Sequence, residues 1–156
     1  MKDLAKSDEN VLVERDIPGN RRKAIMDLQE EILKYPQVEM PVTNHFSKDT
    51  YGRELFIPQG TLLVGKIHKY ESLNILAQGD ISLLTEDGIK RVQAPYVVVS
   101  KPGTKRVGFA HTDCTWVTVH GTSETDVDKI EEEFIAKDYD EVPEISEQDI
   151  KKLMEG

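Results

Sequence analysis

Short apolar runs separated by turn residues fill the middle of the chain. The runs cover residues 53–57, 61–68, 72–77, 80–85, 89–93, 96–99, 105–110 and 115–120. Runs of this length, bounded by Gly, Pro and Asp, are typical of β-strands in a sandwich or a small barrel. Glu86-Asp87-Gly88 is the clearest hairpin turn, because an Asp-Gly pair accepts the positive φ values of a tight turn. About eight short strands closed on themselves predict an all-β core, a double-stranded β-helix or jelly roll.

Helical spacing replaces this pattern on the N-terminal side. Residues 1 to about 18 are expected to form an arm, and Asn20 is expected to cap a helix that starts at Arg21. Apolar positions at Ile25, Leu28 and Ile32 give that helix one apolar stripe, and Pro36 ends it.

Helical spacing also returns after Gly121. Val127, Ile130, Phe134 and Ile135 form a second stripe. A last short helix is expected after Pro143, with a capping pair formed by Ser146 and Asp149. The sequence therefore predicts an N-terminal arm and helix (1–41), a β-barrel (42–121) and an acidic helical tail (122–156). If the protein serves in assembly, deleting residues 122–156 should disrupt oligomers or partner capture without emptying the cavity.

The net charge of −9 is concentrated in that tail. From Gly121 onward there are 13 Asp and Glu against 4 Lys, so the preceding 120 residues are neutral overall. The tail is either a solvated appendage or a docking element for a basic protein partner. This distribution indicates no broad cationic face for nucleic acid, whose binding depends on neutralising phosphates. No apolar stretch suits a membrane span, and one cysteine, Cys114, suits a reducing compartment, so we expect a cytoplasmic protein.

Candidate chemistry lies at fixed spacings within the barrel. Gly60, Lys66, His68, Ser72 and Gly79 form the first set, and Pro95, Lys101, Gly103 and Arg106 form the second. Strand side chains alternate between faces, so Lys66 with His68, and Ser72 with Asn74, share a face that we expect to point inward. Arg106 is expected to enter from a neighbouring strand, with Tyr70 near a strand end.

These two sets resemble the cupin superfamily signature over residues 50 to 121. The halves of that signature read G-x5-H-x-H-x3-E-x6-G and G-x5-P-x-G-x2-H, and here the motif proline is displaced by one place to Pro102. Three segments more narrowly resemble small cupin-like proteins of tailed phages and prophages: Tyr51-Gly52-Arg53-Glu54, Gly65-Lys66-Ile67-His68-Lys69 and Pro102-Gly103-Thr104-Lys105-Arg106. The resemblance implies a jelly roll, frequent dimerisation and a cavity inside the barrel.

The residues at the metal-ligand positions do not suit a metal. Lys66 and Arg106 are cations, Ser72 replaces a carboxylate, and His68 alone is an ordinary ligand. We therefore expect no metal and no cofactor, and the resemblance does not transfer metal-dependent dioxygenase or isomerase activity.

Two basic side chains and a histidine inside a barrel require compensation, because unpaired buried charge is costly. Either acids such as Glu54 or Glu71 neutralise them, or a small anionic ligand does. His120 ends a strand and is expected at the barrel mouth, whereas His45 and His111 are expected to be structural or exposed.

Three functions remain open at this point. The first is a non-catalytic protein that binds a small anion or a protein partner through Lys66, His68, Ser72, Asn74, Arg106 and His120. The second is a metal-free epimerase or isomerase acting on an anionic substrate such as a sugar nucleotide. There His68 would be the base and Tyr70 the acid, with Asp113 or Glu54 orienting the histidine through the fold. The third is a phage structural or assembly protein.

Overall fold

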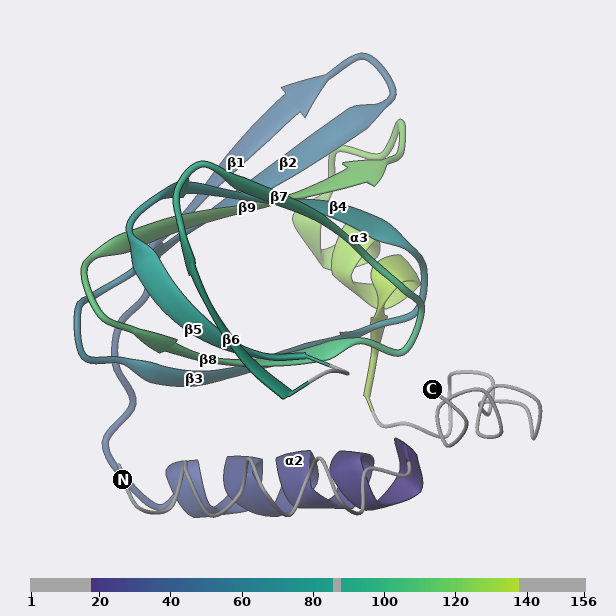
Figure 1. Ribbon diagram of the computed structural model, residues 1–156. Helices are drawn as coiled ribbons and strands as arrows, with labels where there is room; N and C mark the ends of the chain where they lie inside the picture. The colour runs from purple at the N-terminus through teal and green to yellow at the C-terminus, as the bar shows by residue number, and fades with distance from the viewer. Residues whose placement is uncertain (1–17, 86–87, 138–156) are drawn as a thin grey trace, which may run out of the picture.

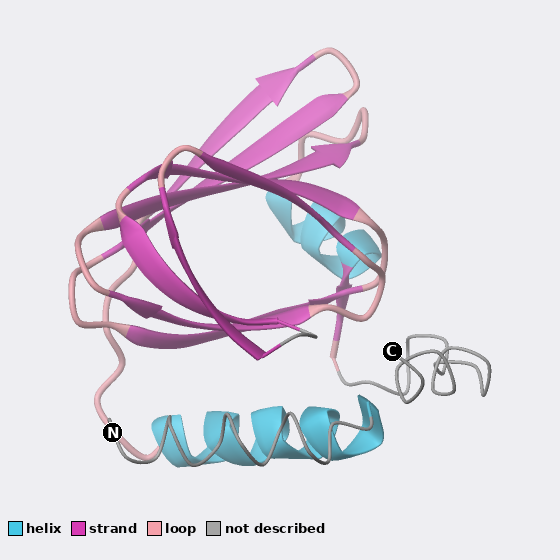
Figure 2. Cartoon of the chain, in the orientation of Figure 1, coloured by secondary structure: helices cyan, strands magenta, loops and turns pink. Residues whose placement is uncertain are grey.

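The computed structural model describes residues 18–85 and 88–137, which form two antiparallel five-stranded sheets and two helices (Figures 1 and 2). Sheet A has the order β1 (Val42–Ser47), β2 (Thr50–Ile57), β9 (Cys114–Gly121), β4 (Ser72–Gln78) and β7 (Tyr96–Ser100). Sheet B has the order β10 (Ile135–Ala136), β3 (Leu62–His68), β8 (Lys105–Ala110), β5 (Asp80–Thr85) and β6 (Gly88–Gln93).

The strand order makes the barrel a jelly roll. From β2 to β9 the chain crosses repeatedly between the two sheets, and most neighbours within a sheet are far apart in sequence, as β2 with β9 and β3 with β8. Two such interleaved sheets are the defining arrangement of the double-stranded β-helix. The predicted fold class is therefore confirmed.

All eight predicted strands are present, and each boundary lies within three residues of its predicted run. Thr85 and Gly88 pair across the β5–β6 hairpin, as expected for its turn, although residues 86–87 themselves lie outside the described residues. Two strands were not predicted. β1 pairs with β2 at one edge of sheet A, and β10 pairs with β3 at one edge of sheet B.

Both described helices lie outside the barrel. Helix α2 (Pro18–Ile32) runs beside sheet B and contacts β3, with Ile25 buried (Figure 1). The prediction that Asn20 caps a helix starting at Arg21 is wrong, because the helix begins at Pro18 and Asn20 lies in its first turn.

Helix α3 (Val127–Phe134) confirms the second apolar stripe. Asp126 caps it by accepting hydrogen bonds from the backbone N–H groups of Asp128 and Lys129, and Ile130 and Phe134 are buried. Ile135, which the stripe had included, belongs to β10 instead. The arm before residue 18 and the last predicted helix, after Pro143, lie outside the described residues. Neither described helix is long and apolar enough to cross a bilayer.

Apolar packing fills one end of the barrel. The cluster consists of Ile57, Leu76, Ile81, Leu83, Val92, Ala110, Cys114 and Trp116. Close packing there explains Gly79, whose φ is +103° and whose added Cβ would lie 2.4 Å from the carbonyl oxygen of Asp113. A side chain at position 79 is therefore excluded by both backbone conformation and space.

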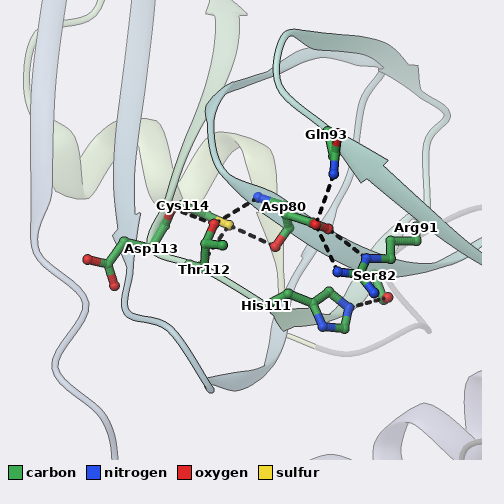
Figure 3. Close-up of polar contacts among 8 residues, drawn as sticks. All are labelled: Asp80, Ser82, Arg91, Gln93, His111, Thr112, Asp113 and Cys114. Atoms are coloured by element: carbon green, nitrogen blue, oxygen red, sulfur yellow. Dashed lines mark hydrogen bonds and ion pairs between the residues drawn. The ribbon is translucent and has the colours of Figure 1, made fainter.

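A polar network on β5, β6 and the β8–β9 turn adjoins this end (Figure 3). Asp80 accepts from Arg91 Nε and Nη2, both at 2.9 Å, and the bonds from Arg91 hold the pKa of the carboxyl at about 2. The Cys114 thiol is buried and contacts the carbonyl oxygens of Asp80 and Thr112, at 3.4 and 3.3 Å. His111 contacts Ser82 Oγ at 2.7 Å. This network holds the turn between β8 and β9 against the barrel.

Inward side chains change from polar to apolar along the length of the barrel. On β2 the inward positions read Tyr51, Arg53, Leu55 and Ile57, and their partners on β9 read His120, Thr118, Trp116 and Cys114. The apolar end merges with the packed cluster, and the polar end lies against α3, where Tyr51 packs with Ile130 and Phe134. This polarity gradient positions the candidate site.

Candidate functional site: a cationic cavity inside the barrel

A cavity of about 560 Å³ lies between the two sheets and α3. Five of the predicted site residues line it: Lys66, His68, Asn74, Arg106 and His120. Ser72 is buried beside the cavity without lining it, and its hydroxyl lies 3.3 Å from Asn74 Nδ2. Tyr70 is 52% exposed and packs edge-on against Phe134 outside the cavity. The structure thus brings five of the predicted residues together at the cavity, with Ser72 next to it and Tyr70 outside it.

Arg106 of β8 is held in place by groups from sheet A. Its guanidinium carbon lies 4.9 Å from the ring centroid of Trp116, a cation–π contact, and Nη2 donates to Ser100 Oγ. Burial lowers the pKa of Arg106, but a guanidinium stays protonated at neutral pH. Because few of its five donors are used, the remainder are available to a ligand.

Asn74 of β4 organises these supporting groups. Its Nδ2 donates to Ser100 Oγ at 2.8 Å, while its Oδ1 accepts from Trp116 Nε1 at 3.1 Å and from Thr118 Oγ1 at 2.8 Å. The amide is fully engaged within the protein. Asn74 therefore lines the cavity as a residue that positions Arg106 through Ser100 and Trp116.

Two imidazoles face each other across the sheets. The rings of His68 (β3) and His120 (β9) stack with centroids 5.6 Å apart and planes 19° apart, and His120 also lies 4.5 Å from the ring centroid of Phe134. Burial is the main cause that lowers the pKa of His68 to about 4, and burial also lowers the pKa of His120. Both rings are therefore neutral at pH 7. The Nδ1 atom of each is buried without a hydrogen-bond partner in the described part of the chain.

Positive charge exceeds negative charge around the cavity. Lys66 forms an ion pair with Glu131 of α3, and Glu131 is the one carboxylate among the described lining residues. Arg53 of β2 and Arg106 have no carboxylate within ion-pair distance in residues 18–85 and 88–137. Positive charge on Arg53 contributes to the lowered pKa of both histidines. The described lining therefore carries two uncompensated guanidinium groups.

The expectation that Glu54 or Glu71 neutralises the cluster is wrong. Glu54 points away from the cavity, because β2 alternates, and its Oε1 lies 3.2 Å from Nε2 of His45. Glu71 is exposed. The compensating acid comes instead from α3, which lies within the predicted C-terminal tail. Five residues of that segment line the cavity: Val127, Ile130, Glu131, Phe134 and Ile135.

The other two histidines stay outside the cavity. His45 is exposed on β1, and His111 contacts Ser82 beside the apolar end. In the portion of the chain that the structure covers, no three His, Cys, Asp or Glu side chains are grouped to hold a metal. The donor set at the cavity is two imidazoles between two guanidinium groups, which repel a cation.

The same geometry bears on the enzyme hypothesis. Asp113 accepts a hydrogen bond from the backbone N–H of Gln59 at 2.8 Å, and Glu54 contacts His45, so neither orients His68. With a pKa of about 4, His68 is a weak base at neutral pH. The site is better suited to holding an anion than to proton abstraction.

Sequence reasoning missed three residues that define the site: Arg53, Trp116 and Glu131. Strand alternation could have identified Arg53 and Trp116. Arg53 lies four residues before Ile57 on β2, and Trp116 lies two residues after Cys114 on β9, so each shares the inward face of a core residue. No sequence pattern indicated Glu131, whose position depends on how α3 docks.

No protein-family model matches this chain, and no curated protein sequence matches it. Solved structures similar to it include a cupin superfamily protein from Desulfitobacterium hafniense, with 8% identity and a TM-score of 0.47 over 56% of this chain and 82% of that one. An acetylacetone dioxygenase from Acinetobacter johnsonii has 14% identity and a TM-score of 0.45 over 55% of this chain and 64% of that one. A cupin family protein with a double-stranded β-helix fold from Methanocaldococcus jannaschii has 11% identity and a TM-score of 0.45 over 55% and 82% of the two chains. The fold assignment rests on the strand order, and the resemblance to tailed-phage proteins stays a prediction.

Proposed function

We propose that this cupin-like barrel binds a small organic anion in its cavity and performs no chemistry on it. The observation that carries the proposal is the surplus of positive charge. Arg53 and Arg106 face the cavity without a carboxylate partner among the described residues, while the one lining acid, Glu131, is engaged by Lys66. An anion supplies a compensating charge for these half-buried cations.

The positioning of Arg106 supports binding in a defined orientation. Ser100 and Trp116 hold its guanidinium, and Asn74 holds both of them. A planar guanidinium fixed in this way presents parallel N–H donors that match a carboxylate or phosphate edge. The neutral imidazoles of His68 and His120 can add hydrogen bonds without adding charge.

Charge-removing variants test the proposal. Mass spectrometry of small molecules released from the purified protein identifies candidate anions, and thermal unfolding with each one measures binding. We expect Arg106→Gln to weaken anion binding by roughly 10- to 100-fold, because hydrogen bonds between charged groups contribute about 1.5–3 kcal/mol. Lys101→Gln is the matched control, since it removes one charge from an exposed position outside the cavity.

The unliganded protein provides a second readout. Arg53 is half-buried, and replacing an unpaired cation there by a neutral side chain removes its partial desolvation cost. Arg53→Gln should therefore leave the melting temperature of the unliganded protein unchanged or raise it. A drop of many degrees would instead mean that Arg53 belongs to an internal ion-pair network, and the proposal would be wrong. Protein-partner binding and phage assembly stay predictions beside this one.

A further inference from the structure

We infer that the ligand is an amphipathic organic acid, whose apolar body lies on the layer formed by Leu55 and Trp116. This inference rests on the proposed function, because it assumes that the acid group lies among the cations. It adds a second requirement, an apolar portion, which neither the charge surplus nor the comparisons supply.

The polarity gradient along the barrel carries the inference. Arg53 and Thr118 pair across β2 and β9, and the next inward pair is Leu55 and Trp116. Beyond that pair the described lining is apolar, with Met40, Leu63, Ile81 and Leu83 joining it. A ligand held at Arg53 and Arg106 therefore meets this apolar lining on the side that faces the packed end of the barrel.

Trp116 marks the boundary between the two halves. Its ring receives the guanidinium of Arg106, and its Nε1 donates to Asn74, so its polar atom is engaged. The rest of the indole lines the cavity beside Leu55. An acid group near Arg106 would thus place the adjoining carbon atoms of the ligand against the indole and Leu55.

The size of the cavity argues in the same direction. At about 560 Å³ it lies within the range of sites that hold organic molecules of several carbon atoms. An inorganic anion would contact the cationic half and leave the apolar half in contact with water. Covering that apolar surface favours binding by roughly fourfold for each buried methylene, the equivalent of about 0.8 kcal/mol.

The single tryptophan of the chain provides the assay, because all indole fluorescence comes from Trp116. Full-length protein is titrated with acetate, butyrate and hexanoate, with inorganic phosphate, and with hexanamide as the uncharged counterpart of hexanoate. We expect affinity to rise roughly fourfold per methylene along the acid series. We also expect hexanamide to bind at least tenfold more weakly than hexanoate, and the emission of Trp116 to change on binding.

The outcomes separate this inference from the proposed function. If phosphate and acetate bind as tightly as hexanoate, the cavity binds anions without an apolar requirement, and the inference is wrong while the proposed function stands. If hexanamide binds as tightly as hexanoate, the cationic half is not used and the proposed function fails. If neither the acids, the amide nor phosphate binds up to millimolar concentration, both are overturned.

A matched pair of variants tests the location. Leu55→Gln places an amide in the apolar layer and should flatten the dependence on chain length while leaving acetate binding within about twofold. Phe56→Gln, at the next position on β2, changes a 37% exposed side chain outside the cavity and should leave the whole series unchanged. Circular dichroism of both variants checks the fold. A chain-length dependence that survives in folded Leu55→Gln would place the apolar body elsewhere and contradict the inference.

Discussion

His68 combines a neutral, half-buried imidazole, whose Nδ1 atom is buried, with a position among cations. Its ring stacks on His120, and positive charge on Arg106 and Arg53 adds to burial in lowering its pKa to about 4. A proton on this ring would add a third uncompensated charge to the cavity. The residue is therefore a hydrogen-bonding group at neutral pH and a source of instability in acid.

This property predicts a specific pH dependence of stability. The folded pKa of His68 is about 4 and the unfolded value is 6.5, so the unfolded chain binds more protons between these limits. The free energy of unfolding should fall as pH drops from 6.5 to 4, by up to about 3 kcal/mol from this residue. Denaturant titrations across that range measure the loss.

His68→Asn should reduce the slope of stability against pH, with His120 responsible for part of the remainder because burial lowers its pKa too. His45→Asn, which removes an exposed imidazole of β1 outside the cavity, is the control for the loss of a histidine. An unchanged slope in folded His68→Asn would show that His68 is not the group that titrates.

At the residue scale, the sequence predicted which side chains line the cavity where motif spacing and strand alternation determine the direction of a side chain. The motif spacing placed Lys66, His68 and Arg106 at the cavity, and the strand end placed His120 there. The partners of these residues were not predictable. Glu131 is more than 60 positions from Lys66, and their contact depends on the docking of a helix onto a barrel.

At the scale of elements, strands with an apolar inward face were predicted well and the edge strands were missed. All six side chains of β1 are exposed, so its sequence VTNHFS lacks the alternation of a half-buried strand. β10 has two residues and no pattern of its own. Both exist because an existing edge, of β2 or of β3, offers backbone hydrogen-bonding groups to the chain.

Helix α3 is held to the barrel at both ends of its buried face. Ile130 and Phe134 pack with Tyr51, and Ala136 of the following β10 packs with Ile67. The ion pair between Glu131 and Lys66 lies between these contacts, with both side chains about half exposed. The apolar contacts are therefore the main source of docking energy, and the ion pair adds a smaller term.

Glu131→Gln should accordingly weaken the docking of α3 modestly, by about 0.2–1 kcal/mol, as is usual for exposed ion pairs. Hydrogen exchange of the α3 backbone should quicken by roughly two- to fivefold. Glu133→Gln, an equal charge change on an exposed side of the same helix, should have no such effect. Equal exchange rates in the two variants would show that the ion pair does not hold the helix.

At the scale of the whole molecule, residues 122–137 and the barrel form one structural unit. The boundary near residue 121 followed a change of pattern from strands to helix. Composition could not show that residues 127–136 complete both the cavity wall and the edge of sheet B. The acidic character of the segment is real, but one of its acids faces a lysine of the barrel.

Truncation tests this unity. A chain ending after Gly121 should lose anion binding and several degrees of melting temperature, because it lacks five lining residues and exposes Tyr51 and Ile67. A chain ending after Lys137 keeps α3 and β10 and should retain binding within about twofold. Equal binding by the two truncated chains, measured by the same thermal assay, would show that α3 is dispensable.

The packed, apolar end of the barrel affects how the ligand specificity of such a protein can change during evolution. Gly79 and the packed cluster carry the folding requirements at that end, whereas the cationic side chains of the cavity lie nearer to α3. Substitutions at the cavity near α3 can therefore change which ligand is bound, while the packed cluster at the other end keeps the fold stable. A barrel whose folding and binding residues lie at opposite ends can change its ligand through a few substitutions.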